Sequence, residues 1–82
     1  METASPQTLR GVRPDAETSD KVYLVKNVSL LRATYQIRLL ALSAGAIGKR
    51  LVLKVPPACR FDGALDGLIQ ALPEVILRED LA

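Results

Sequence analysis

The chain has 82 residues and a net charge of +2, and it contains neither His nor Trp. This length limits it to a single domain, and the lack of His excludes the commonest general base of enzymes. Its one Cys excludes an internal disulfide and fits a reducing compartment.

Residues 1–20 show no hydrophobic periodicity and are rich in Ser, Thr, Pro and charged side chains. This composition predicts a disordered or loosely attached tail that precedes a single α/β domain at residues 21–82. The first residues do not combine a basic stretch with an apolar one, so we expect no signal peptide and a cytoplasmic location.

Three short runs rich in β-branched residues alternate with two segments of helical spacing. The runs are Val22–Lys26, Leu51–Val55 and Val75–Leu77. They predict a small two-layer α/β sandwich of β-α-β-α-β order, with a three-stranded sheet and two helices. The charged face of the second strand favours the order 1-2-3, with both helices on one side. The doubly apolar first strand favours the order 2-1-3.

The first helix is predicted to begin near Ser29, with Asn27 as an alternative cap, and to be stopped by Gly45 and Gly48. Its side chains form two apolar faces. One face consists of Leu30, Ala33, Ile37, Leu40, Ala41 and Ala44, and the other of Leu31, Tyr35, Leu39, Leu42 and Ala46. The first face can cover the sheet. The second needs either the second helix and the tail or another subunit.

The second helix is predicted to begin at an Asp62 cap and to end at Pro73. Its apolar face consists of Leu65, Leu68, Ile69 and Leu72. Asp62 and Asp66 are four residues apart, but a helix cap followed by a solvated side chain explains them better than a catalytic pair.

The string Gly45-Ala46-Ile47-Gly48-Lys49-Arg50 resembles the GxxG loop with which KH domains hold a nucleic-acid backbone. In KH domains this loop joins two helices, whereas here it would join a helix to a strand. The string lacks the spacing of a P-loop. A glycine that ends a helix before an ordinary turn is the alternative interpretation.

Basic residues collect in the middle of the chain, where residues 21–78 carry nine Lys or Arg against three acidic residues. Five of them are candidates for a surface that binds nucleic acid or an acidic protein: Lys26, Lys49, Arg50, Lys54 and Arg78. The order of elements is similar to the start of Alba-type chromatin and RNA-binding domains, a resemblance of topology alone. Charged strands that deter aggregation are the alternative.

Cys59 lies next to Arg60 and just before the expected Asp62 cap, where a helix N-terminus and a cation favour a reactive thiolate. Neither a His base nor a second Cys accompanies it, so a small buried hydrophobic residue is the simpler interpretation. The sequence carries no motif for a metal or another cofactor, and we expect no enzymatic activity.

These patterns together favour a small protein–protein interaction or regulatory module, homodimeric through its first helix. Leu31, Tyr35, Leu39 and Leu42 are the expected interface residues. The basic surface would recruit an acidic protein partner. The alternative function is nucleic-acid binding through the five basic residues, and no membrane contact is expected.

Overall fold

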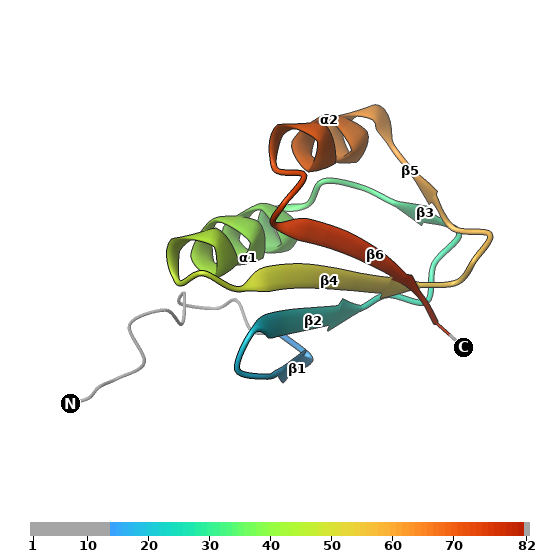
Figure 1. The fold of residues 1–82 in the computed structure, drawn as a ribbon. Helices are drawn as coiled ribbons and strands as arrows, with labels where there is room; N and C mark the ends of the chain where they lie inside the picture. Colours follow the sequence, from blue (N-terminus) through green and yellow to red (C-terminus); the bar gives the residue numbers. More distant parts are fainter. Residues whose placement is uncertain (1–13, 82) are drawn as a thin grey trace.

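The computed structural model describes residues 14–81. Its elements are β1 (Ala16–Glu17), β2 (Lys21–Val25), β3 (Leu30–Leu31), α1 (Tyr35–Ala46), β4 (Arg50–Val55), β5 (Arg60–Phe61), α2 (Gly63–Ala71) and β6 (Ile76–Asp80). The prediction of a small α/β fold with two helices is confirmed (Figure 1).

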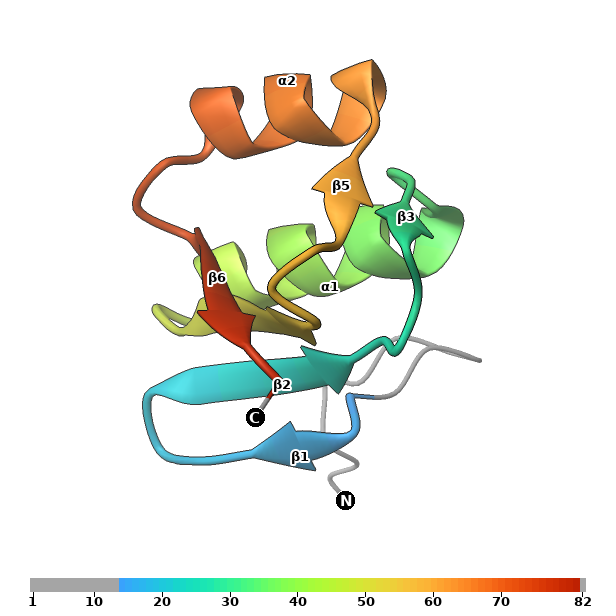
Figure 2. The ribbon, with the colours of Figure 1, turned by 90° about the vertical axis from the view of Figure 1, so that its right-hand side faces the viewer.

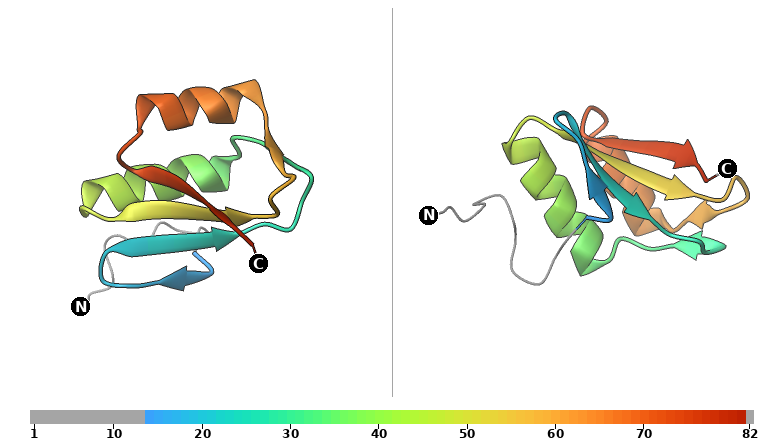
Figure 3. Two further views of the ribbon diagram at one scale, coloured as in Figure 1. Left: turned by 45° about the vertical axis from the view of Figure 1, so that its right-hand side comes forward. Right: turned by 90° about the horizontal axis from the view of Figure 1, so that it is seen from below.

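The main sheet has four strands in the order β1-β2-β4-β6. Strands β2, β4 and β6 run parallel and correspond to the three predicted strands, whereas β1 is antiparallel to β2. The prediction of a three-stranded sheet is therefore not confirmed. Both helices lie on one side of this sheet (Figure 3), as right-handed crossovers between strands in sequential order require.

The core lies between the helices and the central strand β4, whose Leu51, Leu53 and Val55 are fully buried. These side chains alternate along the strand, so all three face the helices. Val52 points to the opposite face and is nevertheless 0% exposed. The register places it between Tyr23 and Leu77, which are half-buried and flank it on that face.

The segment before β2 adds the edge strand β1, in which Ala16 pairs with Tyr23 and Glu17 with Val22. The Asp15 carboxylate extends this pairing by accepting a 2.7 Å hydrogen bond from the backbone N–H of Val25. Of the predicted tail, residues 1–13 lie outside the described residues, whereas the part that follows forms this edge of the sheet.

Helix α1 begins later than the sequence indicates, at Tyr35 instead of near Ser29. Thr34 caps it by accepting a 3.3 Å hydrogen bond from the N–H of Ile37. The Ser29 carbonyl instead accepts a 2.9 Å hydrogen bond from the N–H of Arg60. The prediction of a Ser29 cap was wrong because residues 30–31 pair with a distant segment, a contact that local periodicity does not encode.

That pairing forms a second, two-stranded parallel sheet of β3 and β5, in which Leu30 pairs with Arg60 and Leu31 with Phe61. Figure 2 shows the two short strands side by side, each leading into a helix. The fold thus repeats one unit, a long strand followed by a short strand, a capping residue and a helix. The second cap is Asp62, which accepts a 2.8 Å hydrogen bond from the N–H of Leu65, so this part of the prediction is confirmed.

Candidate interaction surfaces

The outer face of α1, defined here as Tyr35, Leu39, Leu42 and Ala46, runs along the side of the helix that turns away from the core. Tyr35 is 72% exposed and Leu42 is 64% exposed, although both side chains are large and apolar for most of their surface. Leu39 is half-buried and packs against the core at the margin of this face. Neither α2 nor any other described element covers Tyr35 and Leu42.

Leu31 does not belong to this face, although the sequence assigns it there. It lies in β3 and is only 5% exposed, within the same core cluster as Leu65. The structure therefore brings Tyr35, Leu39 and Leu42 together on one helix and separates Leu31 from them.

The five basic candidates are distributed over the molecule instead of forming one patch. Arg50 and Lys54 lie on the sheet face opposite the helices, at opposite ends of β4. Lys54 is 3.6 Å from the Glu79 carboxylate. The Arg78 guanidinium lies 4.8 Å from the centre of the Phe61 ring and donates to the carbonyl oxygens of Pro56 and Pro57. Lys26 follows β2, at the carboxyl end of the sheet.

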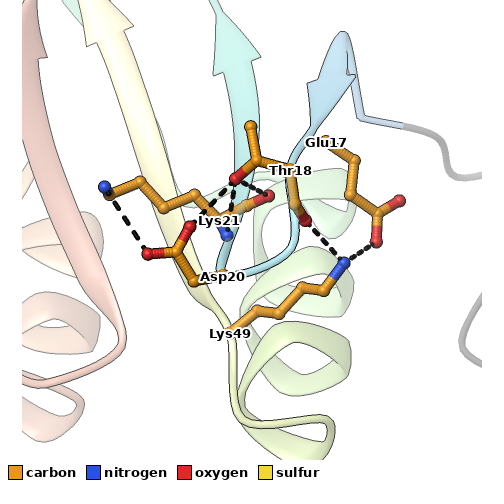
Figure 4. Close-up of polar contacts among 5 residues, drawn as sticks. All are labelled: Glu17, Thr18, Asp20, Lys21 and Lys49. Atoms are coloured by element: carbon orange, nitrogen blue, oxygen red, sulfur yellow. Dashed lines mark hydrogen bonds and ion pairs between the residues drawn. The ribbon is translucent and has the colours of Figure 1, made fainter.

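The Lys49 side chain contacts β1 and the turn that follows it, at the edge of the sheet. Its ammonium group forms an ion pair with the Glu17 carboxylate and donates a 2.8 Å hydrogen bond to the carbonyl oxygen of Thr18 (Figure 4). The same turn holds Asp20, whose carboxylate accepts from the Thr18 hydroxyl at 3.1 Å. Lys49 thus fixes the β1–β2 turn to the start of β4, which lowers the positive charge that it offers to an anion.

The GxxG string ends the helix and does not form an open loop. Gly45 lies within α1, and Gly48 takes φ = 75°, the left-handed conformation that terminates helices. The backbone N–H groups of Gly48 and Lys49 donate hydrogen bonds to carbonyl oxygens of α1. Gly48 donates to Gly45 at 3.3 Å and Lys49 to Ala44 at 2.8 Å. The backbone donors that a phosphate would need are therefore already used.

An open pocket of about 620 Å³ lies beside the β3–β5 sheet, where the chain leaves the carboxyl ends of β2 and β4. Its lining consists of Ser29, Leu30, Ala58, Arg60, Phe61 and Asp62. Sequence reasoning missed this pocket. The predicted order of strands and helices could have indicated it, because open α/β sheets have their crevices at the carboxyl ends of the strands.

The Cys59 side chain is buried beside this pocket and does not line it. Its Sγ atom lies 3.6 Å from the carbonyl oxygen of Arg60. Burial among apolar neighbours favours the structural interpretation of this residue over the nucleophilic one.

Comparison of the chain with models of protein families, with curated proteins and with solved structures finds no match. Among residues 14–81, no helix has the length and hydrophobicity that a membrane crossing needs. No cluster of three or more His, Cys, Asp or Glu side chains suited to a metal ion occurs in the same range.

Proposed function

We propose that the protein is a small, non-enzymatic interaction module that forms a homodimer through the outer face of α1. The observation that carries the proposal is the exposure of Tyr35 and Leu42 on one side of a helix whose other side is fully buried. Large apolar side chains gathered on an exposed helix face are typical of an interface.

A second copy is the proposed occupant because the outer face of α1 is complementary to itself. In an antiparallel pair centred between Leu40 and Ala41, Tyr35 of one copy lies opposite Ala46 of the other, and Leu39 lies opposite Leu42. The largest side chain thus meets the smallest, and the two leucines meet each other. Small residues let helix backbones approach closely enough for such side chains to interdigitate.

The energetics indicate a reversible dimer. Burying one Leu or Phe-sized side chain contributes about 1.5–3 kcal/mol, and the pair would bury two Tyr35 and two Leu42 side chains. Association costs roughly 4–15 kcal/mol in lost translational and rotational freedom. Because gain and cost are of similar size, we expect the dimer to dissociate on dilution.

Leu42→Asp tests the proposal, because a carboxylate at the centre of the apolar face opposes its burial while the exposed position leaves the fold intact. We expect the apparent mass by size exclusion with light scattering to fall relative to the wild type. The matched control is Gln70→Asp, which introduces the same charge at an exposed position of α2. A Leu42→Asp variant with the wild-type mass at every concentration would disprove the helix interface.

We do not extend the proposal to nucleic acid, because the basic side chains named above lie on different faces and Lys49 and Lys54 are already paired with carboxylates. Binding to phosphates would show an affinity that falls steeply with salt. Fluorescence anisotropy with a labelled oligonucleotide at low and high salt tests this alternative directly.

A further inference from the structure

Strand β6 forms the outer edge of the main sheet, and no other described strand pairs with its free side (Figure 3). Two hydrogen bonds fix which backbone groups face β4: Leu51 N–H to the Val75 carbonyl and Leu81 N–H to the Val55 carbonyl, both at 2.7 Å. The N–H and C=O of one strand residue point to the same side, and successive residues alternate between sides. Leu77 and Glu79 therefore direct both backbone groups towards β4, whereas those of Arg78 and Asp80 point outwards.

The sequence of this edge is Leu77-Arg78-Glu79-Asp80-Leu81, and it is complementary in charge to its own reverse, because reversal exchanges Arg78 and Asp80. It has a leucine at each end, opposite charges inside them and Glu79 in the centre. We propose that β6 pairs antiparallel with β6 of a second copy, centred on Glu79, so that two four-stranded sheets join into one continuous sheet.

In this register Arg78 of each copy lies opposite Asp80 of the other, as a hydrogen-bonded pair with Cα atoms about 5.5 Å apart. Opposite charges in that position attract, and the two-fold symmetry makes the contact twice. On the other face of the sheet, Leu77 lies opposite Leu81 of the second copy. Both leucines are only half-buried in the single chain, so pairing removes further apolar surface from water.

The two Glu79 side chains meet at the centre of the pair, which is the one unfavourable contact. Each already has a cation beside it, because Lys54 Nζ lies 3.6 Å from the Glu79 carboxylate. The pair therefore brings together two acids and two lysines, and its centre is neutral overall.

Charged residues on edge strands commonly prevent pairing with other chains. Here their arrangement selects one partner and one register. A shift by two residues would place Arg78 opposite Arg78, or Asp80 opposite Asp80, of the second copy, and a strand with like charges at these positions would be repelled. The charges of this edge are thus complementary to its own copy in the register centred on Glu79.

This contact is independent of the proposed helix interface, because β6 and the outer face of α1 share no residue. A chain that carries both two-fold contacts assembles beyond a dimer, by alternating helix contacts and strand contacts.

Charge variants in a Leu42→Asp background test the strand contact alone, because this background removes the helix contact. On the face of the edge that residues 78 and 80 share, Asp80→Lys leaves two cations and Arg78→Glu leaves two anions. We expect each variant to associate at least tenfold more weakly than the Leu42→Asp parent, and an equimolar mixture of the two to recover a dimer by light scattering. The control Glu74→Lys makes the same charge change at an exposed position before β6 and should leave association unchanged.

Cysteine cross-linking provides a second readout that does not disturb Arg78, whose contacts with Phe61 and the proline carbonyls help to hold β6. In a Cys59→Ser background, Leu77→Cys and Leu81→Cys should cross-link when the two variants are mixed and oxidised, and neither should cross-link alone. Unaltered association of Asp80→Lys, or cross-linking of either cysteine variant with itself in place of the mixture, would overturn the proposal. Neither result would affect the helix interface, which Leu42→Asp tests in the otherwise unmodified chain.

Discussion

Leu31 shows how the role of one side chain depends on the element that holds it. As a helix residue it would belong to an exposed stripe, whereas as a β3 residue it is buried beside Phe61 and Leu65. We expect Leu31→Ala to destabilise the fold by about 2–5 kcal/mol, as for other large-to-small core substitutions. Urea unfolding followed by circular dichroism measures this loss.

Leu42→Ala is the matched control for Leu31→Ala, because the same truncation at an exposed position creates no cavity. We expect it to change the free energy of unfolding by less than about 0.5 kcal/mol at concentrations where the chain is monomeric. Similar losses for the two variants would contradict the placement of Leu31 in the core.

Residue patterns predicted the capping of α2 but not that of α1. Ser29 and Asp62 both precede an apolar run and both fit the preference for N-caps, yet only Asp62 caps a helix. The difference lies in a contact between residues about thirty positions apart, since Ser29 accepts its hydrogen bond from Arg60. A rule that considers only neighbouring residues does not include that contact.

At the scale of elements, we expect replacement by Ala to have opposite effects on stability at two glycines. Gly48 ends α1 with φ = 75°, and a Cβ atom added there would meet nothing within 4 Å, so only backbone strain opposes a side chain. Gly67 lies within α2 and has equally open surroundings. We expect Gly48→Ala to destabilise the fold by about 1–2 kcal/mol and Gly67→Ala to stabilise it by about 0.4–1 kcal/mol.

Thermal unfolding of the two glycine variants measures both effects under one condition. Both substitutions add the same methyl group to open space, so a lower unfolding temperature for Gly48→Ala than for Gly67→Ala reports the backbone conformation alone. If both variants unfolded at the same temperature as the wild type, the left-handed conformation at Gly48 would contribute nothing to stability.

The sequence contained enough information for the long elements and too little for the short ones. Runs of five and six residues with four apolar side chains each identify β2 and β4, and the spacing of Leu65, Leu68 and Leu72 identifies α2. Strands β1, β3 and β5 have two residues each, which is too short for a period to be recognised. The outer face of α1 was predicted because helical spacing continued through Tyr35 and Leu42. The pocket was missed because its lining depends on the β3–β5 pairing.

At the scale of the whole molecule, the order of the strands predicts how stability is distributed. Strand β4 is paired on both sides and has four fully buried side chains, whereas β6 is paired on one side only. We expect the amide protons of Leu51–Val55 to exchange most slowly, because their hydrogen bonds break only when the strands of the sheet separate. Hydrogen exchange followed by NMR measures this order.

The same experiment reports on assembly when it is repeated at rising protein concentration. The N–H groups of Arg78 and Asp80 point to the free edge and should exchange fast in the monomer. Their exchange should become slower as strand pairing protects them, whereas the amides of β4 should change little. Equal exchange rates at all concentrations would show that the β6 edge stays open.

The small β3–β5 ladder also limits how copies of this chain exchange segments. It pairs the segment after β2 with the segment after β4. The first strand–helix unit is therefore paired with the second at two places, through β2–β4 and through β3–β5. A domain-swapped dimer built by exchanging that unit would have to break the β2–β4 and β3–β5 ladders together. The ladder therefore directs self-association towards contacts between surfaces of intact subunits.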